Sequence, residues 1–294
     1  MSTAPPEATP PHGIPRARTL ALTLAALVAF AANSVLCRLA LAAGSIDAAS
    51  FTALRIVAGA LVLALLAGVL RGGGAWRAGS WLSAAWLFAY AIAFSFAYLS
   101  LDAGTGALLL FGAVQASMLL AGLMAGERPR PLQWAGMALA LGGLVYLLRP
   151  GLGAPGPGGA AAMVLAGVAW GLYSLRGRGS RDAVAETAGN FLRAAVPALL
   201  VLPLALPQLA VTWHGAAYAV ASGALASGLG YVVWYVALRG LSASGAATAQ
   251  LAVPVIAAAG GVLLLDEAMT LRLALAALLI LGGIGMTLAA RARG

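Results

Sequence analysis

Long apolar runs alternate with short polar stretches along almost the whole chain. Each run holds about 20 residues, the length that an α-helix needs to cross a hydrocarbon core about 30 Å thick. Gly, Pro and Arg are frequent in the short stretches between the runs. The pattern therefore predicts ten membrane-spanning helices, near residues 19–43, 48–70, 79–100, 104–125, 131–149, 158–176, 186–206, 215–238, 243–264 and 271–290.

Composition agrees with a bilayer environment. Hydrophobic residues make up 62% of the chain and charged residues 9%, whereas about a quarter of the residues are charged in soluble domains. The first residues differ, because they are rich in Pro and small polar side chains and cannot bury enough apolar surface to fold. We expect a disordered cytoplasmic tail at residues 1–17, followed by an all-α integral membrane protein whose first helix is not cleaved.

The arginines predict an orientation. All 17 basic residues are Arg, and the formal charge is +9. With the N-terminus inside, twelve of them fall in inner segments, while the outer loops hold Arg149 and Arg272 alone. This is the distribution described by the positive-inside rule. We expect a multi-pass protein of the plasma (inner) membrane with both termini in the cytoplasm, and we interpret the basic charge as a topology signal rather than a nucleic-acid-binding surface.

The two halves of the chain match each other at an offset of 140 residues. Glu127 corresponds to Glu267, and FAANS at 30–34 corresponds to WGLYS at 170–174. Since five spans is an odd number, the second half must enter the membrane upside down relative to the first. We expect two inverted five-helix repeats, residues 18–150 and 156–292, around a central cavity. Alternating access follows from such an architecture.

Four segments carry a resemblance to a known family: FAANSVLCRLAL at 30–41, FTALRIVAGALVL at 51–63, GERPRPLQWAGMALALGGLVYLL at 126–148 and LDEAMTLRLALAALLILGGIGMTL at 265–288. Through them the chain resembles the EamA-type members of the drug/metabolite transporter superfamily. The resemblance implies a basket of the first, third, fourth, sixth, eighth and ninth helices around a central cavity, with the fifth and tenth helices supporting it or forming contacts. The aromatic rings of spans three, six and eight look like those of the YddG-type exporters of aromatic and neutral amino acids.

Aromatic and amide side chains in the middle of the spans form the candidate substrate site. Tyr90, Phe94 and Tyr98 repeat at i, i+4 and i+8, which keeps them near one helix face. Such rings could bury a planar or apolar substrate and attract an amino group, although ordinary helix packing is the alternative. Amides are costly in hydrocarbon and tend to face a partner or a cavity. The candidates are Asn33, Tyr90, Phe94, Tyr98, Phe111, Gln115, Trp170, Tyr173, Tyr231, Trp234, Tyr235, Gln250 and Pro254.

Charged residues within or beside the spans have fewer interpretations. Arg55 and Arg193 are intramembrane charges without an acid at mid-span, so they either bind a substrate carboxylate or hold helix ends, and the second role is favoured. Glu127 and Glu267 precede spans, and we expect them to cap the helices that follow. The single Cys37 excludes an intramolecular disulfide and a cysteine metal cluster.

These features favour one function over its alternatives. With no carboxylate near the middle of a span, we expect facilitated export of small metabolites, best aromatic or neutral amino acids. A multidrug or other metabolite exporter coupled to protons is the alternative, and an intramembrane enzyme is a third possibility that the lack of H-E-x-x-H and G-x-S-x-G motifs disfavours. We expect a small-molecule substrate and the lipid bilayer as partners, no cofactor or metal, and a monomer or homodimer.

Overall fold

The computed structural model describes residues 16–71, 77–126, 129–151, 154–177, 182–205, 209–241 and 249–292, together with residues 180, 207 and 246. Helices make up most of this part of the chain: α1 (Arg16–Ala42), α2 (Ala48–Arg71), α3 (Trp81–Ala97), α4 (Ala103–Met124), α5 (Pro131–Leu148), α6 (Pro157–Gly177), α7 (Ala183–Ala205), α8 (Trp213–Ala221), the π-helix η3 (Ser222–Leu229), α9 (Gly230–Leu238), α11 (Ala252–Leu265) and α12 (Leu271–Ala292).

The described helices confirm the prediction of an all-α membrane protein. Eight segments are long and apolar enough to cross a membrane, with α8, η3 and α9 counted as one segment, and α3 and α11 are shorter apolar helices. Most ends lie within a few residues of the predicted ones. Since α1 begins at Arg16, the last two residues of the predicted tail are helical, while residues 1–15 lie outside the described part. The start predicted for the ninth span, at 243, also lies outside it.

Short polar motifs explain several helix ends. Ser80 precedes α3 and accepts a hydrogen bond from the backbone N–H of Ser83, and Thr212 does the same for Gly215 at the start of α8. Such caps satisfy amide groups that have no partner within the first turn of a helix. At the other end of a span, Asp266 has a left-handed backbone with φ 54° and terminates α11. These polar residues therefore fix where α3 and α8 begin and where α11 ends.

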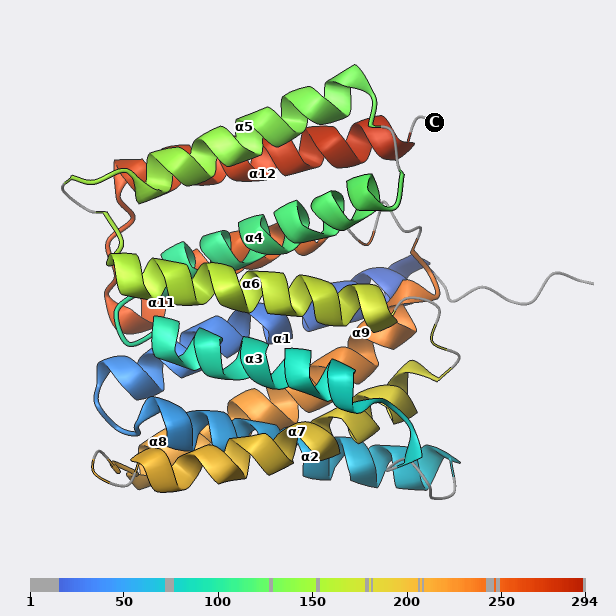
Figure 1. The fold of residues 1–294 in the computed structure, drawn as a ribbon, viewed down its shortest axis with the longest axis vertical. Coiled ribbons are helices and arrows are strands. Elements are labelled where there is room, and N and C mark those ends of the chain that lie inside the picture. Colours follow the sequence, from blue (N-terminus) through green and yellow to red (C-terminus); the bar gives the residue numbers. More distant parts are fainter. Residues whose placement is uncertain are drawn as a thin grey trace, which may run out of the picture.

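Contacts between the two halves occur in related pairs. Helix α2 packs against its repeat partner α7, and α5 packs against α12. The contact of α3 with α6 corresponds to that of α9 with α1 in the other half. The contact of α4 with α6 likewise corresponds to that of α11 with α1. Figure 1 shows α5 and α12 along one edge, α2, α7 and α8 along the opposite edge, and the other helices between them. This pairing confirms two inverted five-helix halves.

The outer faces of the helices are apolar. Leu65 and Val69 on α2 are 69% and 75% exposed, and Leu263 on α11 is 80% exposed. A soluble protein rarely presents such continuous apolar surface to water. The hydrocarbon core of a bilayer is the environment that suits such faces, because each helix satisfies its own backbone polar groups.

Candidate substrate cavity

A cavity of about 1700 Å³ lies in the middle of the bundle and opens at one end. Its lining reaches from Asn33 and Phe94, in the middle of α1 and α3, to the exposed Arg130 and Arg176 at the ends of α5 and α6. That end of the bundle also holds the start of α1 and the end of α12 (Figure 1). The lining includes eleven of the thirteen candidates: Asn33, Tyr90, Phe94, Phe111, Gln115, Trp170, Tyr173, Tyr231, Trp234, Tyr235 and Gln250.

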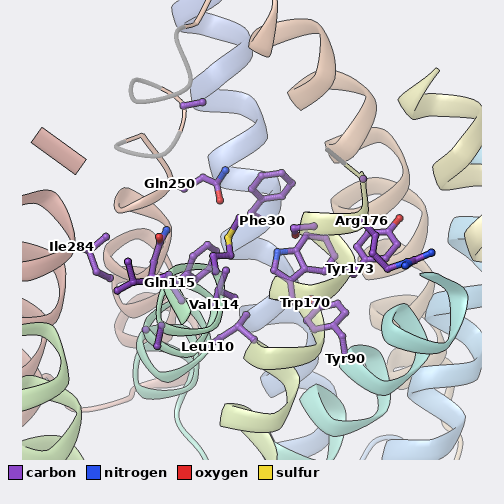
Figure 2. Close-up of a pocket in the computed structure, with 18 of the residues that line it drawn as sticks. Phe30, Tyr90, Leu110, Val114, Gln115, Trp170, Tyr173, Arg176, Gln250 and Ile284 are labelled. Carbon is purple, nitrogen blue, oxygen red and sulfur yellow. The ribbon is translucent and has the colours of Figure 1, made fainter. Parts of the chain in front are cut away.

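Aromatic rings from several helices meet around Trp170. Its ring centroid lies 4.8 Å from that of Tyr90, 5.4 Å from that of Tyr173 and 5.5 Å from that of Tyr231, with the last pair stacked at 19°. Phe30 on α1 continues the wall, 5.8 Å from Tyr231. Figure 2 shows Tyr90, Trp170 and Tyr173 gathered on one side of the cavity. We call Phe30, Tyr90, Phe94, Trp170, Tyr173, Tyr231 and Trp234 the aromatic cluster.

A small set of amides and hydroxyls interrupts the aromatic and aliphatic lining. Asn33 Oδ1 accepts hydrogen bonds from the hydroxyls of Ser222 (2.8 Å) and Ser227 (3.3 Å), both on η3. A π-helical segment inside a longer helix is frequently found at a functional site. Gln115 and Gln250 approach from α4 and from the segment before α11 (Figure 2). An apolar cavity with few, fixed polar groups is the usual form of a small-molecule site.

Two candidates lie away from the cavity. Tyr98 is fully buried beyond Phe94, and its hydroxyl donates to the carbonyl oxygen of Ala103 at 3.3 Å. Pro254 instead lines a separate small pocket together with Gly104 and Val255. The sequence period placed Tyr98 on the correct face of α3, but one further turn takes this residue past the closed end of the cavity.

Charged groups connect the helices at the closed end, and we call them the closing cluster: Arg38, Asp102 and Glu267. Arg38 pairs with Glu267 at 3.2 Å and with Asp102 at 3.6 Å, and it also donates to the Tyr98 carbonyl oxygen at 3.1 Å. Glu267 accepts from the Ala103 backbone N–H at 2.8 Å. These contacts tie α1, the end of α3, the start of α4 and the α11–α12 connection together.

The position of Glu267 corrects its predicted role. We expected this residue to cap the helix that follows it, but it binds the first amide of α4 instead. Partial burial raises the pKa of the Glu267 carboxyl, and the Ala103 N–H and Arg38 oppose that shift. Its repeat partner Glu127 lies outside the described residues.

The mouth of the cavity contains polar residues that the sequence did not single out. Arg176 donates to the Ser83 hydroxyl at 3.2 Å, and Thr187 lies 3.1 Å from the Tyr235 hydroxyl. Asn190 accepts from the Ser80 backbone N–H at 2.9 Å. The spacing of Glu186, Thr187 and Asn190 along the start of α7 is the signal that could have revealed them, since it places all three near one helix face.

The fifth and tenth helices border the cavity as well as support it. Met137 and Leu141 of α5 and Ile284 and Thr287 of α12 form an aliphatic side opposite the aromatic cluster. In Figure 2, Ile284 lies across α4 from Trp170. The family resemblance had implied that these helices support the basket or form contacts.

A membrane protein with two inverted helical halves around a central, partly polar cavity has the architecture of a carrier. The model of the "EamA-like transporter family" matches residues 157–289. An uncharacterised protein of Pseudomonas aeruginosa, PA1977, is 56% identical over 278 residues, which cover 95% of this chain and 97% of that protein. A solved crystal structure superposes with a TM-score of 0.62 at 26% identity, covering 91% of this chain and 99% of the other. The chain belongs to the EamA-like transporter family and is therefore a membrane transporter of small substrates rather than an enzyme.

Proposed function

We propose that this transporter exports small metabolites with a planar or apolar body, and that aromatic and neutral amino acids are its best candidate substrates. The aromatic cluster around Trp170 carries this proposal, because it lines the middle of the cavity with stacked, tilted and edge-on rings. Burial of a substrate ring there would supply most of the affinity. Asn33, Gln115 and Gln250 would bind the polar end of the substrate.

The proposed transport cycle is alternating access. The open mouth lies at the end of the bundle where Arg130 and Arg176 gather and where both terminal helices have their chain ends. By the positive-inside rule this end faces the cytoplasm of a cell with an inner membrane. The conformation is then open to the inside, and the closing cluster lies on the outside. Exchange of conformations between the repeats at 18–150 and 156–292 would open the other side.

We propose that transport is facilitated and follows the substrate gradient. Glu186, at the mouth, is the one carboxylate among the described residues that line the cavity. Coupling to protons generally relies on an acid near the middle of the membrane. A facilitated exporter would relieve an excess of substrate inside the cell.

Transport in proteoliposomes tests the proposal. Vesicles containing the purified protein are loaded with labelled tryptophan, phenylalanine or leucine, and efflux is measured with and without an imposed pH difference. We expect saturable efflux in the absence of a pH difference and no net accumulation against a gradient. Accumulation that occurs only when a pH difference is imposed would replace this mechanism with proton-coupled export. Transport of cationic drugs without transport of amino acids would reject the proposed substrates.

A further inference from the structure

Arg55 is a buried cation without an anionic partner. It lies about two turns from the start of α2, and its side chain is 3% exposed. The guanidinium carbon lies 4.9 Å from the ring centroid of Phe94 and 5.4 Å from that of Tyr90. Nη1 has no hydrogen-bond partner within the described residues. A buried charge in this state is costly, and in a membrane protein it points to a function.

Arg193 is the counterpart of Arg55 in the second half, because Leu54–Arg55 matches Leu192–Arg193 at an offset of 138 residues, two fewer than the offset of 140 found elsewhere. Arg193 donates to the backbone carbonyl oxygens of Ala78 and Gly189 and so holds the start of α3 against α7. That is the structural role which the sequence favoured for both arginines. Arg55 makes no comparable carbonyl contact in the part of the chain that the structure describes. The two positions therefore differ in role although they match in sequence.

No acid in the described residues neutralises Arg55. Asp102 and Glu267 pair with Arg38 at the closed end, and Asp47 accepts from the Ser50 backbone N–H at the start of α2. Glu186 lies at the mouth of the cavity. Among the described residues, the charged side chains that line the cavity are Arg130, Arg176 and Glu186, so their net charge is also positive.

Tyr90 and Phe94 separate Arg55 from the cavity. Both rings line the cavity, whereas Arg55 contacts them from behind. A cation held against a ring opposes the approach of a second cation to the same ring, because like charges repel strongly in a medium of low dielectric constant. The same charge attracts an anion on the cavity side. Aromatic rings alone would favour a cationic substrate, whereas these rings, with Arg55 behind them, favour an anionic one.

We propose that Arg55 is a specificity-determining residue, which makes the cavity select substrates that carry a carboxylate, whether anionic or zwitterionic, over amine cations of the same body. The substrate carboxylate lies on the cavity side of Tyr90 and Phe94 and supplies the counter-charge that the protein lacks. Asn33 assists, because its oxygen is occupied by two serine hydroxyls and its amide nitrogen remains to donate. This inference rests on the proposed use of the cavity as the substrate site, but not on amino acids as the substrate.

Binding to the purified full-length protein in nanodiscs tests the charge preference. Four probes share an indole body: indole-3-propionate, tryptophan, tryptamine and the neutral indole-3-propionamide. We expect wild type to bind the two carboxylate probes at least about tenfold more tightly than tryptamine, as a charge interaction at an effective dielectric constant near 20 allows. Arg55→Met should reduce that ratio to near one and leave propionamide binding unchanged, and Arg55→Lys should retain most of it.

Arg193→Met is the matched control. We expect it to lower the thermal unfolding midpoint, because it removes two carbonyl contacts, and to leave the ratio between carboxylate and amine probes unchanged. Arg55→Met should keep or raise the midpoint, since it removes a buried cation without a partner. The inference would be overturned if Arg55→Met left the ratio between carboxylate and amine affinities unchanged. It would also be overturned if this variant lowered the thermal unfolding midpoint as much as Arg193→Met does.

A second series of probes separates the charge inference from the proposal of aromatic substrates. If wild type binds none of the indole probes, the aromatic substrate proposal is wrong, and the charge test proceeds with 4-methylvalerate, leucine, isopentylamine and 4-methylvaleramide. A carboxylate preference that depends on Arg55 in this aliphatic series would still support the inference. Equal affinity for acids and amines in wild type, or no binding in either series, would overturn it.

Discussion

Trp170 contacts the rings of Tyr90, Tyr173 and Tyr231, which come from three different positions around the cavity. Its removal should therefore open the aromatic cluster at its centre. We expect Trp170→Ala to weaken tryptophan binding by at least about tenfold, since each favourable ring contact contributes about 0.5–1.5 kcal/mol beyond burial. Titration calorimetry with the purified protein measures the change.

Trp134→Ala is the control for that substitution. Trp134 is 50% exposed on α5 and is not among the residues that line the cavity. Its loss should leave the affinity unchanged while removing a side chain of the same size. An equal loss of affinity in the two variants would show that Trp170 acts through general stability rather than through substrate contact.

At the scale of single residues, the sequence predicted ring positions that follow a helical period and missed those that do not. Tyr90 and Phe94 reached the cavity as the period predicted. Phe30 has no ring at a helical spacing from it, but its match to Trp170 in the repeat is a signal that could have identified it. Arg55 was identified as an intramembrane charge, but only the structure shows that aromatic rings rather than carbonyl oxygens surround its guanidinium group.

At the scale of helices, the adjacent glycines Gly282 and Gly283 of α12 differ, because only one of them packs against another helix. Gly283 of α12 lies against the backbone of Gly136 and Ala140 of α5, so a Cβ atom there would collide with α5. The neighbouring Gly282 is exposed and has nothing near its missing side chain. The α5–α12 contact thus depends on one glycine of the pair.

Substitution by alanine should separate the two glycines. We expect Gly283→Ala to destabilise the protein by about 1–3 kcal/mol through overpacking. Gly282→Ala should stabilise it by up to about 1 kcal/mol, because alanine restricts the unfolded chain and favours a helix. Thermal unfolding in detergent measures both. Equal effects would contradict the close α5–α12 contact.

The closing cluster predicts that stability depends on pH. Burial raises the pKa of the Glu267 carboxyl. A carboxyl whose pKa is raised in the folded protein contributes stability that is fully present below its unfolded pKa and is lost as pH rises through its folded pKa. We therefore expect the unfolding midpoint of wild type, relative to Glu267→Gln, to fall between acidic and neutral pH. A difference that grows with pH would contradict the direction of the shift.

Asp102→Asn is the matched control in the same cluster. The Asp102 side chain is 54% exposed and lies 3.6 Å from Arg38. Ion pairs of this kind contribute at most about 1 kcal/mol. We expect its substitution to change the midpoint less than Glu267→Ala, which also removes the acceptor for the first amide of α4.

Helix positions followed closely from hydrophobic run lengths, because a bilayer fixes the length of each span. Local details that depend on tertiary contacts did not. The span predicted at 215–238 contains the π-helix Ser222–Leu229, which the run of apolar residues could not reveal. Similarly, the sequence marked Glu267 as a helix cap but could not show that the capped helix is α4.

At the scale of the whole molecule, the repeat offset of 140 residues predicted the inverted halves, and paired contacts such as α2 with α7 and α5 with α12 confirm them. The cavity follows from this arrangement, since the paired halves enclose it between them. Which end is open depends on how the helices pack in one conformation. The sequence is the same in both conformations, so its patterns cannot predict which end of the cavity is open.

Counterflow in proteoliposomes tests the central claim of an alternating-access carrier most directly. Vesicles are loaded with excess unlabelled tryptophan and diluted into a trace of labelled tryptophan. For an alternating-access carrier we expect that label accumulates transiently above its outside concentration, that its entry saturates, and that Trp170→Ala weakens both effects. A rate of label entry that rises linearly with concentration, with label inside never exceeding its equilibrium level, would indicate a channel. That result would contradict alternating access.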